Sequence, residues 1–63
     1  MFIYKINIDG SSVAVSSETE LTDEDVIRKA LDNEIIDDAN ADVEDITDDE
    51  DEKAAFADVT YRV

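Results

Sequence analysis

From Phe2 to Asp9 every second side chain is apolar, and the residues between them are polar except for Ile3. A period of two places successive side chains on opposite faces of an extended backbone, so this stretch is predicted to be a strand. Asp9-Gly10 follows, and this dipeptide is the strongest short signal for a hairpin turn, because glycine adopts positive φ without steric cost. Residues 12–16 are then expected to return as the second strand of a β-hairpin. Its apolar face comprises Phe2, Tyr4, Ile6, Ile8, Val13 and Val15.

The spacing of apolar residues changes from two to three and four after residue 21. Thr22 is placed to cap a helix, because its hydroxyl can accept a backbone N–H of the first turn. The three acidic residues that follow it complement the positive end of the helix dipole. We therefore expect a helix from Asp23 to about Asn33 or Ile36. The apolar residues at helical intervals are Ile27, Ala30, Leu31 and Ile35.

The pattern is less regular beyond residue 36. Residues 43–47 fit either a short strand or an irregular turn, and residues 48–53 fit either a brief helix or the loop of a second hairpin. Alternation returns from Ala55, which predicts a C-terminal strand. The apolar side of that strand comprises Ala57, Val59, Tyr61 and Val63.

A chain of 63 residues allows one small domain, residues 1–63. The order of elements (ββαβ or ββαββ) favours an α+β fold with an antiparallel sheet of three or four strands and one helix packed on one face. The expected core is Phe2, Tyr4, Ile6, Ile8, Val13, Val15, Ile27, Leu31, Val59 and Tyr61.

The acidic residues are concentrated in one central segment. The chain has 19 acidic and five basic residues, a net charge of −14. Residues 18–52 hold 17 of the acidic residues against Arg28 and Lys29, a local net charge of −15, whereas the rest of the chain has a net charge of +1. This segregation costs free energy through like-charge repulsion, so a functional reason for it is favoured over a merely solvated surface.

The composition excludes several classes of function. Without cysteine or histidine, the chain has no disulfide, no Cys/His zinc site and no histidine-activated nucleophile. One glycine is too few for a glycine-rich phosphate loop. We therefore expect no enzymatic activity and no cofactor.

The chain shows no signal peptide and no apolar run near the roughly 20 residues that span a bilayer. A soluble, cytoplasmic protein is expected. Because anionic lipid and nucleic acid would repel an acidic surface, neither a membrane nor nucleic acid is expected as a direct ligand. The expected partner is a basic protein surface, and the oligomeric state is left open.

One spacing of acidic residues is typical of a calcium-binding loop. Asp38, Asn40 and Asp42 match the first three ligand positions of an EF-hand loop after a helix. The match then fails, because Val43 occupies the position of the turn glycine and Asp49 that of the bidentate glutamate. A solvated acidic loop with weak cation affinity is favoured over a dedicated site.

The remaining interpretation is electrostatic mimicry of nucleic acid. Acidic residues three or four apart on a helix lie about 5–6 Å apart, and B-DNA carries one charge per roughly 1.7 Å of axis. In size, acidity, absence of catalytic groups and helix-on-sheet pattern, the chain resembles the DNA-mimic inhibitors of phages and mobile elements, which include anti-CRISPR and anti-restriction proteins. The resemblance implies an inhibitor that blocks a basic nucleic-acid-binding site of a defence complex in the host cytoplasm.

Two alternatives stay open beside mimicry. One is a generic acidic module that binds a basic protein unconnected with nucleic acid, and the other is adaptation of a small domain to high salt. The candidate partner-binding residues are Glu20, Asp23, Glu24, Asp32, Glu34, Asp37, Asp38, Asp42, Glu44, Asp45, Asp48, Asp49, Glu50, Asp51 and Glu52.

Overall fold

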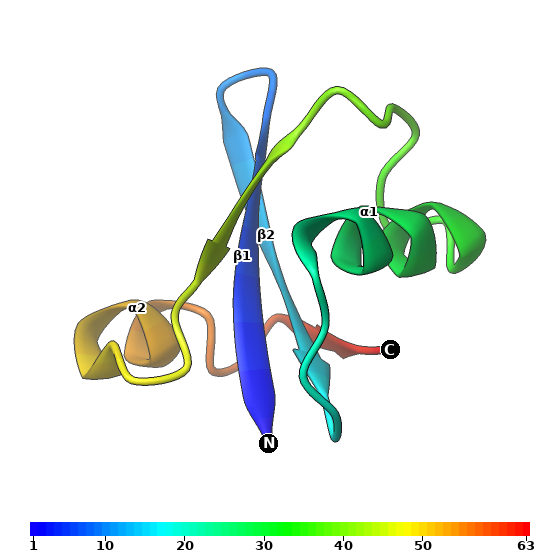
Figure 1. Ribbon diagram of the computed structural model, residues 1–63. Helices are drawn as coiled ribbons and strands as arrows, with labels where there is room; N and C mark the ends of the chain where they lie inside the picture. The colour runs from blue at the N-terminus through cyan, green and yellow to red at the C-terminus, as the bar shows by residue number, and fades with distance from the viewer.

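A computed structural model describes all 63 residues as a four-stranded sheet with one helix on each face (Figure 1). The strands lie in the order β3-β1-β2-β4, so β3 and β4 are the two edges. The α+β class is confirmed, whereas the single expected helix is replaced by two. The elements are β1 (Phe2–Ile8), β2 (Ser11–Ser17), α1 (Asp23–Asp32), β3 (Asp42–Asp45), α2 (Glu50–Ala55) and β4 (Thr60–Arg62).

The predicted hairpin is confirmed. β1 and β2 pair antiparallel along their whole length, with Ile8 opposite Ser11 at the turn. Asp9 and Gly10 have φ of 49° and 79°. Positive φ at both central residues is the signature of a type I′ turn, whose twist matches that of the flanking strands.

The predicted helix and its cap are also confirmed. The Asp25 N–H donates to Thr22 Oγ1 at 3.2 Å, and the helix ends at the C-cap Asn33. The segment before α1 is held to the sheet, because the Leu21 N–H donates to the hydroxyl of the buried Tyr4 at 2.9 Å.

The core under α1 differs from the prediction in the helix residues that it uses. Val26 and Ala30 are fully buried, whereas Ile27 and Leu31 are only partly buried. The pair Val26 and Ala30 and the pair Ile27 and Leu31 both have i,i+4 spacing. One pair is displaced from the other by one residue, or about 100° around the helix axis, so the spacing alone does not tell which pair faces the sheet. The cluster on this face comprises Tyr4, Ile6, Val15, Val26, Ala30 and Ile36.

The expected burial of the C-terminal strand is wrong. Val59 is 58% exposed and Tyr61 51% exposed. The strand is only three residues long and lies at an edge of the sheet, so it has a neighbouring strand on one side alone. Phe2, Ile8 and Val13 are partly buried and pack against the core cluster.

The expectation of a wholly antiparallel sheet is wrong at the last strand. β3 pairs antiparallel with β1, as expected, but β4 pairs parallel with β2. The reason is the segment after β3, which forms α2 on the face opposite α1 and so carries the chain across to the other edge (Figure 1). A helical crossover of this kind is what joins parallel strands, whereas a hairpin joins antiparallel ones.

The face under α2 has a small buried layer of its own. Ala14 and Ile46 are buried there, outside the cluster under α1. The Ile46 N–H donates to the Ile3 carbonyl at 2.9 Å, which extends the β1–β3 pairing by one residue. Thr47 continues this attachment, since the Ile3 N–H donates to its Oγ1 at 3.0 Å. These contacts fix the start of α2 against the central strand.

Candidate acidic binding surface

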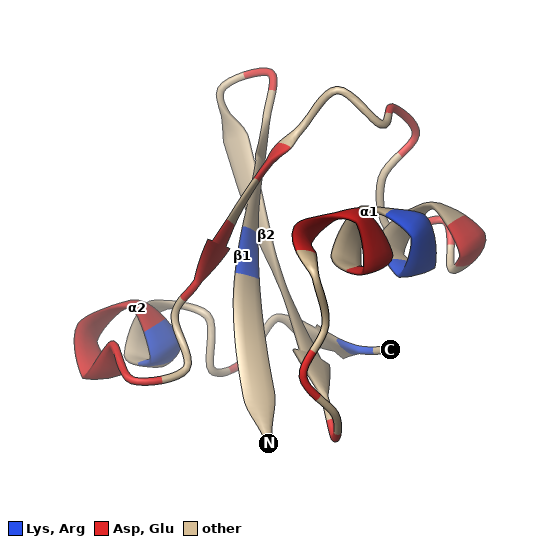
Figure 2. Ribbon diagram, viewed as in Figure 1, with Lys and Arg blue, Asp and Glu red and all other residues tan.

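The fifteen predicted acidic residues all lie at the surface. Fourteen are exposed, and Glu52 is half-buried against the sheet. They follow the chain from α1 on one face, around the β3 edge, to α2 on the other face, whereas β1, β2 and β4 carry few charges (Figure 2). We call the fifteen residues the acidic surface. It is a band around one edge of the sheet and not a single flat face.

The structure brings five of these residues together. Asp45, Asp48, Asp49, Glu50 and Asp51 line an open hollow of about 520 Å³ that contains no apolar side chain. We call it the acidic hollow. The residues on α1 and in the 34–38 connection lie apart from it, on or beside the other face of the sheet.

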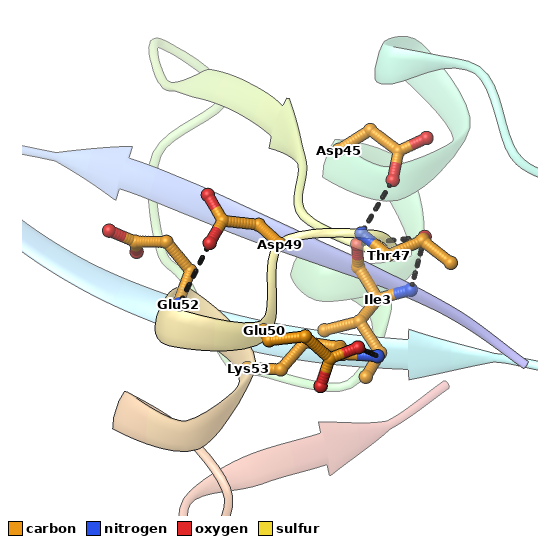
Figure 3. Close-up of polar contacts among 7 residues, drawn as sticks. All are labelled: Ile3, Asp45, Thr47, Asp49, Glu50, Glu52 and Lys53. Carbon is orange, nitrogen blue, oxygen red and sulfur yellow. Dashed lines mark hydrogen bonds and ion pairs between the residues drawn. The ribbon is translucent and has the colours of Figure 1, made fainter.

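Local hydrogen bonds build the acidic hollow (Figure 3). The Thr47 N–H donates to Asp45 Oδ1 at 2.9 Å, so the chain turns sharply after β3. Asp49 is the N-cap of α2, because its Oδ1 accepts the Glu52 N–H at 3.1 Å. Two of the five carboxylates therefore have structural roles in addition to their charge.

The pKa of Asp45 is lowered from its ordinary value. The main cause is hydrogen bonding from the Thr47 side chain, and the Thr47 backbone N–H contributes second. Hydrogen bonds to a carboxylate favour its charged form. The hollow therefore keeps the Asp45 charge at and below neutral pH.

Few of the acidic residues are neutralised by the chain itself. Lys5 Nζ lies 3.0 Å from Glu52 Oε2, and Lys53 Nζ lies 3.1 Å from Glu50 Oε1. The other thirteen residues of the acidic surface have no cationic partner within 4.0 Å. Their charge is therefore free to act on molecules outside the chain.

Lys5 anchors α2 to the sheet. The hydrogen bond with Glu52 raises the pKa of Lys5; partial desolvation opposes this shift, and the nearby Glu44 and Asp49 reinforce it. Sequence reasoning did not single out Lys5. The signal available was a lone cation on the polar side of a strand that is otherwise uncharged up to Asp9.

A second hollow, of about 400 Å³, lies on the outer side of α1. It is lined by Glu24, Ile27, Arg28, Leu31 and Ala39. Arg28 Nη1 lies 3.6 Å from Asp25 Oδ1, one turn away. Ile27 and Leu31, which were assigned to the core, pack against the core cluster and also line this hollow beside the acidic residues of α1.

The EF-hand-like spacing does not gather its ligands. Asp38 Oδ1 accepts the Asn40 N–H at 2.9 Å, which uses this carboxylate in a local turn, and Asp42 opens β3. No group of three or more acidic residues in the structure is arranged to hold a metal ion.

Comparison with known proteins adds no family to this description. No protein-family model matches the chain, and neither a curated protein nor a solved structure is significantly similar to it. Neither of the two helices has the length and apolar character needed to cross a bilayer.

Proposed function

We propose that the chain is a non-enzymatic inhibitor whose acidic surface mimics nucleic-acid phosphates and blocks the basic nucleic-acid-binding site of a host defence complex, of the anti-CRISPR or anti-restriction kind. The observation that carries the proposal is the set of thirteen exposed carboxylates without an internal cation. The folded domain holds these carboxylates in position, so the acidic surface already exists in the protein without a partner.

The unneutralised charge supplies the main attraction in this proposal. A groove lined by Lys and Arg binds fixed carboxylates as it binds phosphates, with release of counterions, and long-range attraction speeds the encounter. The interaction is expected to weaken steeply with salt, since charges at a surface are screened beyond about 10 Å in 0.1 M salt.

The shape of the acidic band also supports a channel as the target. Acidic residues occupy both faces and the edge between them, on a domain whose shortest extent is 17 Å. Walls of a basic channel can contact such a band from two sides. A flat basic surface could contact only one side of it.

Capture of a partner from host lysate tests the proposal. The chain is immobilised, and retained proteins are eluted first with a double-stranded DNA oligonucleotide and then with salt. The proposal expects nucleic-acid-binding proteins that DNA displaces. Retention of proteins that DNA fails to displace and only salt removes would instead support the generic acidic module.

A charge-matched pair of variants controls the capture. Asp48→Asn with Asp51→Asn removes two charges from the acidic hollow, neither of which makes an ion pair. Asp9→Asn with Asp58→Asn removes two charges outside the acidic surface. Loss of capture in the first variant alone supports the proposed surface, and equal behaviour of the two variants contradicts it.

A further inference from the structure

The β4 edge of the sheet has backbone groups that face away from the molecule. The Val63 N–H donates to the Ser16 carbonyl of β2 at 2.9 Å. Because successive backbone groups of a strand alternate between its two sides, those of Tyr61 also point to β2, and those of Thr60 and Arg62 point outward. No fifth strand lies there. The edge therefore offers two N–H and two C=O groups for further pairing.

Two of the three exposed large apolar side chains of the protein lie at the same edge. Val59 and Tyr61 are more than half exposed, and both belong to or directly precede β4. An exposed edge strand with few charges is a template for pairing with another strand, and Arg62 is the only charged residue of β4. The opposite edge lacks this property, because Asp42, Glu44 and Asp45 place exposed charges along β3.

The distribution of charge over the chain indicates where a second copy of it can bind. Two copies of a chain with a net charge of −14 repel each other, most strongly across the acidic surface. Residues 54–63 contain only Asp58 and Arg62 and so have no net charge. The β4 edge is therefore where a second copy meets the least repulsion.

The strand is also complementary to itself. In an antiparallel pair about a two-fold axis at Tyr61, Thr60 of one copy lies opposite Arg62 of the other. Thr60 and Arg62 are the residues whose backbone groups face outward. Each Thr60–Arg62 pair across the axis can therefore exchange N–H and C=O hydrogen bonds, which gives two hydrogen-bonded pairs. Tyr61 then meets Tyr61 of the second copy at the closer, non-hydrogen-bonded position, where aromatic pairs stabilise a sheet.

We propose that β4 is a self-association edge, through which two copies of the chain pair antiparallel into one continuous sheet. This inference stands independently of the proposed function. The two edges should then respond to salt in opposite directions. Screening weakens attraction of the acidic surface to a basic partner, but it relieves repulsion between two acidic copies.

Sedimentation equilibrium of the whole chain tests the proposal. At about 0.5 M NaCl, the apparent mass is expected to rise with concentration from 7.0 kDa towards twice that value. At about 0.02 M NaCl the association constant is expected to fall by about tenfold or more. A mass of one copy at every concentration up to about 1 mM in high salt, a range that covers weak strand-edge contacts, would overturn the proposal.

Two variants at one position locate the edge. Arg62→Pro removes an outward N–H that β2 does not use, so it should abolish association while circular dichroism shows an intact fold. Arg62→Ala removes the same side chain, and its exposed pair with Glu18, but keeps the N–H and should still associate. A second probe, Tyr61→Lys, sets charge against charge at the axis and should weaken association about tenfold or more. Association that survives both Arg62→Pro and Tyr61→Lys places the contact elsewhere and contradicts the proposal.

Discussion

The two edges of the sheet are built on opposite principles. The β3 edge carries exposed carboxylates and leads into the acidic hollow, whereas the β4 edge is short, has exposed Tyr61, and belongs to a segment, residues 54–63, with no net charge. Charged side chains on an edge prevent pairing with other strands. The acidic residues of β3 can thus serve two purposes, since they repel a further strand or a second copy and present charge to a basic partner. The β4 edge does neither.

Both edges are held by the two central strands, of which β1 pairs with β3 on one side and with β2 on the other. Ile6 is fully buried and lies opposite Val43 of β3 and Val13 of β2. Ile6→Ala should cost about 2–5 kcal/mol, out of a total of roughly 3–9 kcal/mol for a chain of this length. Urea unfolding measures the loss. Ile8→Ala, at a partly buried position of the same strand, should cost clearly less; equal losses would contradict the described core.

Asp49 both caps α2 and lines the acidic hollow. Asp49→Ala should lower the free energy of unfolding by about 1 kcal/mol, because the first turn of the helix loses its side-chain acceptor. Asp48→Ala removes the same charge from the neighbouring residue, which makes no hydrogen bond through its side chain in the structure, and should have little effect. If both variants melt alike, charge and not capping determines stability at this end of the sheet.

The ion pair of Lys5 with Glu52 should give a smaller, pH-dependent effect. Because the pair raises the Lys5 pKa, its stabilisation is fully present below the unfolded value of about 10.4. It is lost as pH rises through the raised, folded value. Wild type should therefore have a higher Tm than Lys5→Met by a constant amount near neutral pH, and this difference should disappear in strong alkali. Lys53→Met changes the net charge equally but breaks the more exposed Glu50 pair, so its effect should be weaker.

Asp45 should show the reverse pH dependence, with the smallest effect of the series. Its lowered pKa means that the charged form stabilises the fold above the unfolded value of about 3.9, and that this contribution is lost as pH falls through the folded value. The difference in Tm between wild type and Asp45→Asn should vanish in acid. If the difference stays the same from neutral pH down into strong acid, the Thr47 contacts do not stabilise the charged form of Asp45.

The parts of the fold that were predictable are those with local causes. The hairpin follows from Asp9-Gly10 and an alternating pattern, and α1 follows from the Thr22 cap. Burial of Val26 in place of Ile27 was not predictable, because both lie on helical stripes with the same spacing. The parallel pairing of β4 was not predictable either, since it depends on which edge the last strand reaches after α2, and no local signal decides that.

The exposure of the candidate residues was predictable, but their arrangement was not. Exposure of the fifteen acidic residues follows from the high cost of burying unpaired charge. Their division between two faces depends on α2 crossing the sheet, which the pattern of residues 48–53 left open. Lys5 was missed because its role arises from contact with Glu52, 47 positions further along the chain.

We propose that the position of the charge, and not its total, determines binding. The decisive measurement is the salt dependence of affinity for a basic protein captured from lysate, made on wild type and on the two charge-matched double variants. We expect a weaker affinity and a shallower salt slope for Asp48→Asn with Asp51→Asn, and wild-type behaviour for Asp9→Asn with Asp58→Asn. Identical slopes and affinities for the two double variants would contradict it.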